Sequence, residues 1–348
     1  MKRVLTGLRQ KDFDELAMEL KVSPFRARQI HNQIYLKSVS DIQEMTDLSK
    51  SFRNELSEIA VVSNTKIVKK QISKDGTIKY LLEFPDQNRV ETVLMRFDNR
   101  ANLTACVSSQ IGCPVNCRFC ATGANGFVRN LTATEIVDQV LTIQRDTGLK
   151  VTNVVFMGQG EPLLNLKNVL EALDIFNIDF QIGARRITIS TSGIAPKINE
   201  LAELNLQSTL ALSLHCADSS VRKEIMPIEN KFPLTELKKS LKNYIELTGR
   251  RITIEYLLIK DLTDTPQMAK KAVEYLKDLK CNINLIPYNS VENKMFKKPL
   301  KSSVMKFKYL LEQANKKVTI RLERGADIDA ACGQLNGKYK NESTNTKS

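Results

Sequence analysis

The sequence predicts an α/β fold, in which a partial barrel of six strand–helix units follows a small helical domain and a short antiparallel β extension. Three hydrophobic patterns predict this fold. Apolar residues recur every three or four positions in the first 60 residues, alternate between about 65 and 100, and from 102 onward form β-rich runs separated by helical patterns. Alternating strands and helices indicate a parallel sheet with helices outside it, and six such units are too few for a closed eight-fold barrel.

Residues 1–62 are expected to form the helical domain. Helical spacing covers residues 12–22, 25–37 and 40–59, and Pro24 lies near the start of the second helix. Asp47 or Ser49 is suited to begin the next helix, because short polar side chains cap helix N-termini.

Residues 63–100 are expected to form the β extension. Strand patterns cover residues 65–73, 77–84 and 89–97. The letters KDGT between the first two strands are typical of a hairpin turn, so these strands are expected to be antiparallel.

Residues 101–335 are expected to form the barrel, and the polar residues 336–348 a disordered tail. Thr132 and Glu135 have the spacing of a capping box before the helical pattern at 133–146, and a further helical pattern covers 233–249. A ligand site is expected at the carboxyl ends of the parallel strands. The six predicted strands are 102–109, 152–158, 185–191, 208–214, 251–259 and 281–288.

The chain is strongly basic, with 52 lysines and arginines against 39 acidic residues and a formal charge of +13. Such a charge favours a polyanionic partner, of which nucleic acid is the commonest. No apolar run approaches the ~20 residues of a membrane span, and the N-terminus lacks the apolar segment of a secretory signal. We therefore expect a cytoplasmic protein with no membrane partner.

Four of the seven cysteines lie close together in the sequence. Cys113, Cys117 and Cys120 have C-x3-C-x2-C spacing in the loop after the first barrel strand, and Cys106 lies seven residues before Cys113. Three adjacent thiols can hold zinc or an iron–sulfur cluster. A closed zinc site needs a fourth ligand, for which Cys106 is a candidate, whereas an open position would admit a substrate or cofactor.

Two motifs together resemble the radical S-adenosylmethionine (SAM) superfamily: the three-cysteine loop, and a glycine–glutamate stretch, FMGQGEPLLN, after the second barrel strand. Gly158 and Gly160 let the backbone approach a ligand, and Glu161 can accept hydrogen bonds from an ammonium group. Further stretches resemble the RlmN/Cfr family of radical SAM RNA adenine methyltransferases over residues 3–338. These stretches are SSQIGCPVNCRFCATG, ISTSGIAP, LALSLH, INLIPYN, DIDAACGQL, FRARQI and EMTDLSK.

The resemblance implies a radical SAM partial (β/α)6 barrel with one [4Fe–4S] cluster per chain, held by Cys113, Cys117 and Cys120. It implies two SAM molecules per turnover. The SAM contacts that it assigns are Gly160, Glu161, Ser190, Ser213, Leu214, His215 and Asn289.

The resemblance also assigns three catalytic residues. Cys332 takes a methyl group from one SAM, and a radical from a second SAM removes a hydrogen from that methyl group so that the carbon adds to adenine. Glu91 accepts the proton that the adenine carbon loses. Cys106 releases the protein–RNA adduct by forming a transient disulfide with Cys332.

The letters GEPLLN and the match in the helical domain favour the RlmN type, which methylates C2 of adenine in 23S rRNA and in some tRNAs. The alternative within the family is the Cfr type, which methylates C8 of adenine and confers antibiotic resistance. The resemblance further implies a monomer and an electron donor such as flavodoxin or ferredoxin. Arg26, Arg28 and Lys37 are the expected RNA-backbone contacts.

Two other classes remain open from the sequence. A radical SAM activating enzyme for a protein substrate would lack the pair Cys106 and Cys332, and a zinc-stabilised RNA-binding protein would not need Glu161. Cys216 and Cys281 have no family role and are expected to be buried thiols. Gln159 stands where relatives commonly have methionine, and His31 is expected to be structural or on an RNA-facing surface.

Overall fold

The computed structural model describes residues 2–97, 100–289 and 295–335. The predicted disordered tail, 336–348, lies outside the described residues. Among the described helices, none combines the length and the apolar character needed to cross a bilayer.

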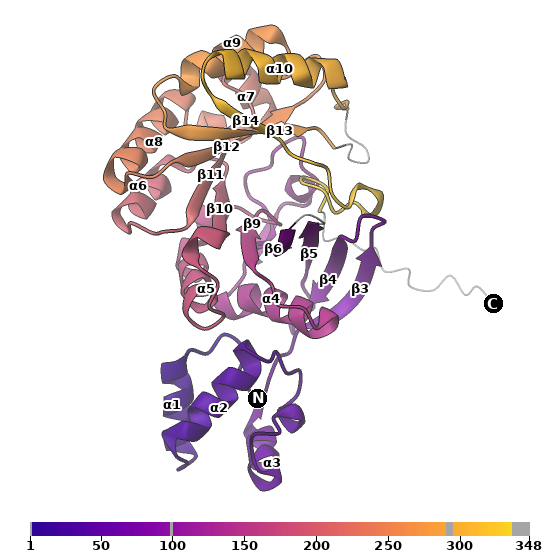
Figure 1. Ribbon diagram of the computed structural model, residues 1–348, viewed down its shortest axis with the longest axis vertical. Coiled ribbons are helices and arrows are strands. Elements are labelled where there is room, and N and C mark those ends of the chain that lie inside the picture. Colours follow the sequence, from indigo (N-terminus) through magenta and orange to yellow (C-terminus); the bar gives the residue numbers. More distant parts are fainter. Residues whose placement is uncertain (1, 98–99, 290–294, 336–348) are drawn as a thin grey trace, which may run out of the picture.

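A single ten-stranded sheet forms the centre of the molecule (Figure 1). Neighbouring strands are parallel from β14 to β6 and antiparallel from β6 to β3. The predicted α/β class is therefore confirmed, and the three predicted extension strands continue the barrel sheet. In spatial order the strands are β14 (Lys317–Ile320), β13 (Cys281–Pro287), β12 (Ile252–Leu258), β11 (Thr209–Ser213), β10 (Ile187–Thr191), β9 (Asn153–Phe156), β6 (Arg100–Cys106), β5 (Arg89–Phe97), β4 (Ile78–Glu83) and β3 (Lys66–Ile72).

The parallel part of the sheet has helices on its outer face (Figure 1). Thr132 caps α4 and exchanges hydrogen bonds with Glu135, so the predicted capping box is present. The helices are α4 (Ala133–Thr147), α5 (Leu166–Ile178), α6 (Ala195–Glu203), α7 (Ser219–Ile225), α8 (Leu234–Thr248), α9 (Pro266–Leu276) and α10 (Lys301–Gln313).

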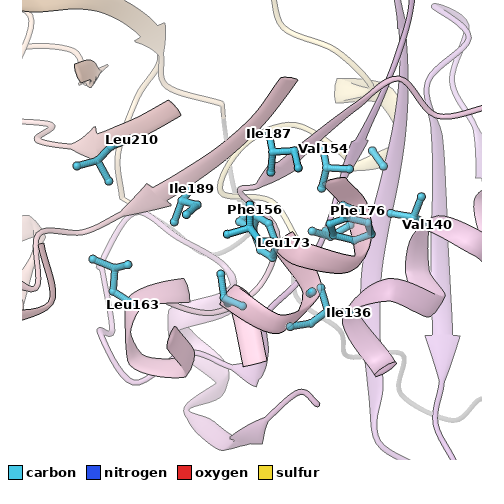
Figure 2. Close-up of a cluster of buried hydrophobic side chains, with 14 of the residues drawn as sticks. Ile136, Val140, Val154, Phe156, Leu163, Leu173, Phe176, Ile187, Ile189 and Leu210 are labelled. Atoms are coloured by element: carbon cyan, nitrogen blue, oxygen red, sulfur yellow. The ribbon is translucent and has the colours of Figure 1, made fainter. Parts of the chain in front are cut away.

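The core fills the space between these helices and the sheet. Figure 2 shows Ile136 and Val140 of α4 and Phe176 of α5 near Val154 and Phe156 of β9. All five side chains are at most 1% exposed. This packing fixes the strands whose carboxyl ends carry the site.

The N-terminal lobe consists of α1 (Gln10–Glu19), α2 (Pro24–Tyr35), the 3-10 turn η1 (Ile42–Glu44), α3 (Lys50–Ile59) and a parallel pair of two-residue strands, β1 (Arg3–Val4) and β2 (Ala60–Val61). The helical pattern over 40–59 divides into η1 and α3, and α3 begins behind its N-cap Ser49, one of the two predicted helix starts. His31 is structural: its Nε2 lies 2.7 Å from Oδ1 of Asp179, just after α5. This contact ties the lobe to the barrel.

Several short elements surround the site and were not predicted. Strands β7 (Gln110–Gly112) and β8 (Phe127–Asn130) pair on either side of the cysteine loop, which also contains the turn η2 (Thr122–Asn125). Strand β14 adds a seventh parallel strand to the six predicted ones. The remaining 3-10 turns are η3 (Pro162–Asn165), η4 (Ala184–Arg186), η5 (Pro227–Asn230) and η6 (Ala326–Ile328).

Candidate active site

Two adjoining cavities lie at the carboxyl ends of the parallel strands, where the sequence predicts a site. The cysteine-loop cavity, of about 160 Å³, is lined by Cys113, Cys117, Cys120, Gly160, Glu161, Ser190, Ser213 and His215 among others. The thiol cavity, of about 720 Å³, is lined by Cys106 and Asn289. Cys332 and Arg321 line both cavities. Most of the predicted site residues therefore meet in one region.

The cysteine loop is held by backbone hydrogen bonds. Cys113 donates its N–H to the carbonyl of Gly126 at 2.9 Å, and Cys120 donates to the carbonyl of Cys117 at 3.1 Å. Gly112 has φ +71°, and a Cβ there would lie 1.9 Å from the carbonyl oxygen of Gly126. Only glycine fits this close crossing of β7 and β8.

The three loop cysteines are half-buried and line the same cavity. Burial and the neighbouring acidic groups raise the pKa of Cys113 to about 12 and that of Cys117 well above its usual value. A cationic iron centre would reverse this preference for the protonated form. Among the described residues, no three His, Cys, Asp or Glu side chains converge on a point suited to one metal ion. Three cysteine thiols lining one cavity are the donor set of an iron–sulfur cluster, in which each cysteine binds a different iron.

The glycine–glutamate loop packs against the strand that leads to the cysteines. A Cβ on Gly158 would lie 2.7 Å from Oγ of Ser108, and one on Gly160 would lie 2.6 Å from Cβ of Gln110. Both glycines also line the cysteine-loop cavity. Glycine is therefore required here by packing of protein on protein, in addition to the predicted approach of a ligand.

Glu161 is buried and accepts backbone hydrogen bonds from Ser192 at 2.6 Å and Leu163 at 3.1 Å. Burial raises the pKa of this carboxyl group, and these hydrogen bonds partly oppose the rise. A bound ammonium group would favour the ionised form. The hydroxyl of Ser192, which lines the same cavity, is buried and has no hydrogen-bond partner among the described residues.

His215 lies at the end of β11 with φ +57°. Burial and the nearby guanidinium of Arg222 lower its pKa to about 3, so the ring is neutral. The ring packs edge-on against Phe119, and its buried Nδ1 has no partner within the described part of the chain. A neutral ring nitrogen facing the cavity can donate to or accept from a ligand. Leu214 is fully buried and lines neither cavity.

Cys332 is exposed and lies on the segment that follows β14. Its carbonyl accepts a hydrogen bond from Nδ2 of Asn289 at 3.4 Å, and the next carbonyl, of Gly333, accepts from the N–H of Ala121 at 2.7 Å. The hydroxyl of Thr122 donates to the carbonyl of Leu335 at 2.6 Å. These bonds fasten the Cys332 segment to the cysteine loop.

Cys106 is buried at the end of β6 and faces the thiol cavity. Burial, with the neighbouring Cys332 as the second cause, raises the pKa of its thiol to about 12. The positive charge of Arg321 opposes this rise. The two thiols that the sequence pairs are therefore close enough to interact electrostatically. Cys216 and Cys281 are buried, as predicted.

Glu91 is buried on β5 and forms an ion pair with Lys79 of β4 at 3.0 Å. It lines neither cavity, but it shares a strand face with Val93, which lines the thiol cavity. Gln159, which stands where relatives commonly have methionine, forms a structural hydrogen bond. Its Oε1 accepts the backbone N–H of Glu91 at 2.9 Å. This bond links the β extension to the glycine loop.

Sequence reasoning missed Lys79, Glu255 and Arg321. Lys79 was detectable from the hairpin register, which places β4 beside β5. Glu255 was detectable as an acidic residue inside the apolar strand β12. Arg321 follows a strand of four residues that gave no recognisable pattern.

Comparison with known proteins identifies the family. Residues 4–62 match the ribosomal RNA large subunit methyltransferase N-terminal domain, and residues 107–272 match the radical SAM superfamily. A probable dual-specificity RNA methyltransferase RlmN from Syntrophomonas wolfei is 42% identical over 97% of this chain and 98% of its own. The chain belongs to the RlmN family. A second RlmN protein, from Alkaliphilus oremlandii, is 44% identical over 96% of this chain and 98% of its own.

A solved structure agrees with the RlmN assignment. The crystal structure of a radical SAM methyltransferase from Sphaerobacter thermophilus superposes with a TM-score of 0.91 at 37% identity, covering 97% of this chain and all of that one. The predicted resemblance and the radical SAM fold are confirmed. The chain is a radical SAM RNA methyltransferase of the RlmN type, a family whose members use SAM and a [4Fe–4S] cluster. The protein-activating and zinc-protein alternatives are therefore wrong.

Proposed function

We propose that this enzyme methylates C2 of adenine in 23S rRNA and in some tRNAs. The proposed route passes through an S-methyl group on Cys332, a covalent protein–RNA adduct and a transient disulfide between Cys332 and Cys106. The observation that supports it best is the position of Cys332, which lines both the cysteine-loop cavity and the thiol cavity. A residue that accepts a methyl group in the cysteine-loop cavity and passes its carbon to adenine in the thiol cavity must reach both cavities.

The cysteine-loop cavity has the side chains that a cluster with bound SAM requires. Cys113, Cys117 and Cys120 would hold the cluster, and Glu161 with the unpartnered hydroxyl of Ser192 would bind polar groups of SAM. Ser190, Ser213 and His215 are further predicted SAM contacts that line this cavity. Asn289 would contact SAM from the thiol cavity. When bound, the cluster and SAM supply an electrophilic methyl group and, after one-electron reduction, hydrogen abstraction.

Cys332 is suited to accept the methyl group because it is exposed. Its thiolate forms a sulfur–carbon bond while the sulfonium–carbon bond of SAM breaks and the electron pair leaves with the SAM sulfur. Cys106 is suited to the later step because its buried thiol stays protonated at neutral pH. It is thereby kept from competing for the methyl group.

Glu91 would accept the proton that the adenine carbon loses. Its ion pair with Lys79 and its strand face, shared with Val93 at the thiol cavity, support this role. The proposal further includes one cluster per chain, two SAM molecules per turnover, a flavodoxin or ferredoxin electron donor, and a monomer in the cytoplasm.

Nucleoside mass spectrometry tests the proposed specificity. Anaerobically reconstituted protein, SAM and a reductant are incubated with rRNA and tRNA that lack the modification, with Cys332→Ala as the matched control. We expect 2-methyladenosine from the wild type and none from the variant. An 8-methyladenosine product would assign the Cfr-type activity, and neither product from cluster-loaded protein would refute adenine as the substrate.

A further inference from the structure

Arg321 is a cation in the wall between the two cavities that the proposed steps leave without a role. It follows directly after β14, and its side chain is 28% exposed, so the guanidinium reaches open space. It lines both cavities, as Cys332 does. A cation at this point affects whichever charged group forms on either side.

The guanidinium is held from several sides. Nη1 lies 3.6 Å from Oε1 of Glu255 and 3.3 Å from Sδ of Met157. Oε1 of Glu255 also accepts a hydrogen bond from Nδ2 of Asn284 at 3.0 Å, which fixes the carboxylate between β12 and β13. Glu255 is 3% exposed and lines the cysteine-loop cavity, so this ion pair is a buried part of the cavity wall.

The groups that surround Arg321 include two cysteine thiols. Burial opposes the charge of the guanidinium, but Cys332, Glu255 and Cys106 favour it and raise the pKa of Arg321. Arg321 and Cys332 line both cavities and Cys106 lines the thiol cavity, so the guanidinium and both thiols border the same space. Because the carboxylate is fixed from behind, the remaining donors of the guanidinium face the cavities.

We propose that Arg321, positioned by Glu255, stabilises negative charge on the sulfur of Cys332 and then of Cys106. This inference rests on the proposed function. In methyl acceptance, the anionic sulfur of Cys332 gains a methyl group, the sulfonium–carbon bond breaks, and the leaving pair stays on the SAM sulfur. Arg321, which lines both cavities together with Cys332, stabilises the anionic sulfur as it attacks the methyl carbon.

Alkylation of Cys332 in the cluster-loaded enzyme tests the proposal without RNA or SAM. Iodoacetamide is added under anaerobic conditions at pH 7, and the modified Cys332 peptide is quantified over time. Because the attacking sulfur loses the cation that lines the same cavities, Arg321→Met should alkylate about tenfold more slowly. Arg321→Lys should restore most of the rate, and Glu255→Gln should give an intermediate rate. Arg250→Met, at the opposite end of the barrel beside Gln207, should match the wild type.

Equal alkylation rates in the wild type and Arg321→Met, with intact cluster absorbance, would overturn the proposal. If Arg321→Met does not fold, the other two variants decide. A wild-type alkylation rate in Glu255→Gln, combined with loss of Cys332 reactivity in Arg321→Lys, would then overturn the proposal. The wild type is also incubated with SAM alone, and the mass of the Cys332 peptide is measured. Absence of the methyl group there would refute the proposed function, while the alkylation rates would still decide the role of Arg321.

Discussion

Cys106 and Cys332 are neighbours in space with opposite environments. Cys106 is buried beneath the thiol cavity, and burial raises its pKa to about 12, whereas Cys332 is exposed beside the cavity with the cysteine loop. In the proposed route the two thiols therefore have different tasks, one accepting the methyl group early and one reacting only after the adduct forms. The difference in environment arises mainly from burial, which the sequence does not show.

Replacing Cys106 with alanine should trap the enzyme on its RNA. The adduct through Cys332 would still form, but no second thiol would be available to release it. Denaturing gels should show a protein–RNA species that accumulates in Cys106→Ala and is absent from Cys332→Ala. Fully methylated free RNA produced by Cys106→Ala would contradict the resolving role.

Release of the adduct should quicken as pH rises. Since the pKa of Cys106 is raised to about 12, the thiolate is a minor form at neutral pH, and its population grows about tenfold per pH unit below that value. Adduct formed at pH 7 and shifted to pH 8 should decay several-fold faster in a single turnover. A decay rate independent of pH would show that proton loss from Cys106 does not limit release.

At the level of elements, the hairpin between β3 and β4 supports the Cys332 segment. Asp75 accepts the N–H of Gly325 at 3.1 Å, Ser73 donates to Asp327 at 2.5 Å, and Lys79 donates to the carbonyl of Asp329 at 3.1 Å. Burial tends to raise the pKa of Asp75, but hydrogen bonds including those from Thr77 and Gly325 outweigh it and leave the pKa at about 2. Asp75 therefore stays ionised, and the support stays intact, unless the pH falls toward 2.

Asp75→Ala should loosen the Cys332 segment. A hydrogen bond to a charged group contributes about 1.5–3 kcal/mol, so amide exchange in residues 325–332 should rise by about tenfold or more. Methyl loading of Cys332 should slow correspondingly. Asp278→Ala, an exposed carboxylate on the far side of the barrel, serves as the control. Unchanged exchange in Asp75→Ala would show that the hairpin does not position this segment.

The strand pattern and the KDGT turn predicted this hairpin, and the cysteine and glycine motifs predicted the lining of the cysteine-loop cavity. The contact between Ser73 and Asp327 joins residues 254 positions apart, and no local pattern encodes it. Strands β7, β8 and β14 have three or four residues each, too few for a period to be recognised. Arg321 was missed for the same reason, since it follows β14.

At the scale of the whole molecule, the N-terminal lobe lies beside α4 and α5 (Figure 1), and none of its described residues lines the thiol cavity. Of the three predicted RNA contacts, Arg26 is engaged by Gln29 at 2.7 Å and Lys37 by Asp47 at 2.9 Å. Arg28 is exposed, with its guanidinium over the ring of Phe25 at 6.0 Å. Arg28 is therefore the one of the three whose side chain has no hydrogen bond or ion pair to another described residue.

Arg28→Gln should weaken RNA binding more than Lys37→Gln does. Each lost phosphate contact lowers the slope of log affinity against log salt by about 0.7–0.9, and SAM-dependent methyl loading of Cys332 should be unaffected. Titrations of 23S rRNA fragments at several salt concentrations measure both effects, with the exposed Lys239 of α8 changed to glutamine as the control. If Arg28→Gln leaves both the RNA affinity and its salt dependence unchanged, Arg28 does not contact the RNA.

The proposed route requires the methyl carbon to pass through Cys332. Enzyme preloaded with trideuteromethyl SAM, freed of that SAM and given RNA with unlabelled SAM and a reductant, tests it in a single turnover. One deuterium is abstracted from the methyl group on Cys332 before the carbon joins the base, so the first product should be methyladenosine carrying two deuteriums. Three deuteriums would mean that an intact methyl group is transferred, and none would mean that the carbon never rested on Cys332.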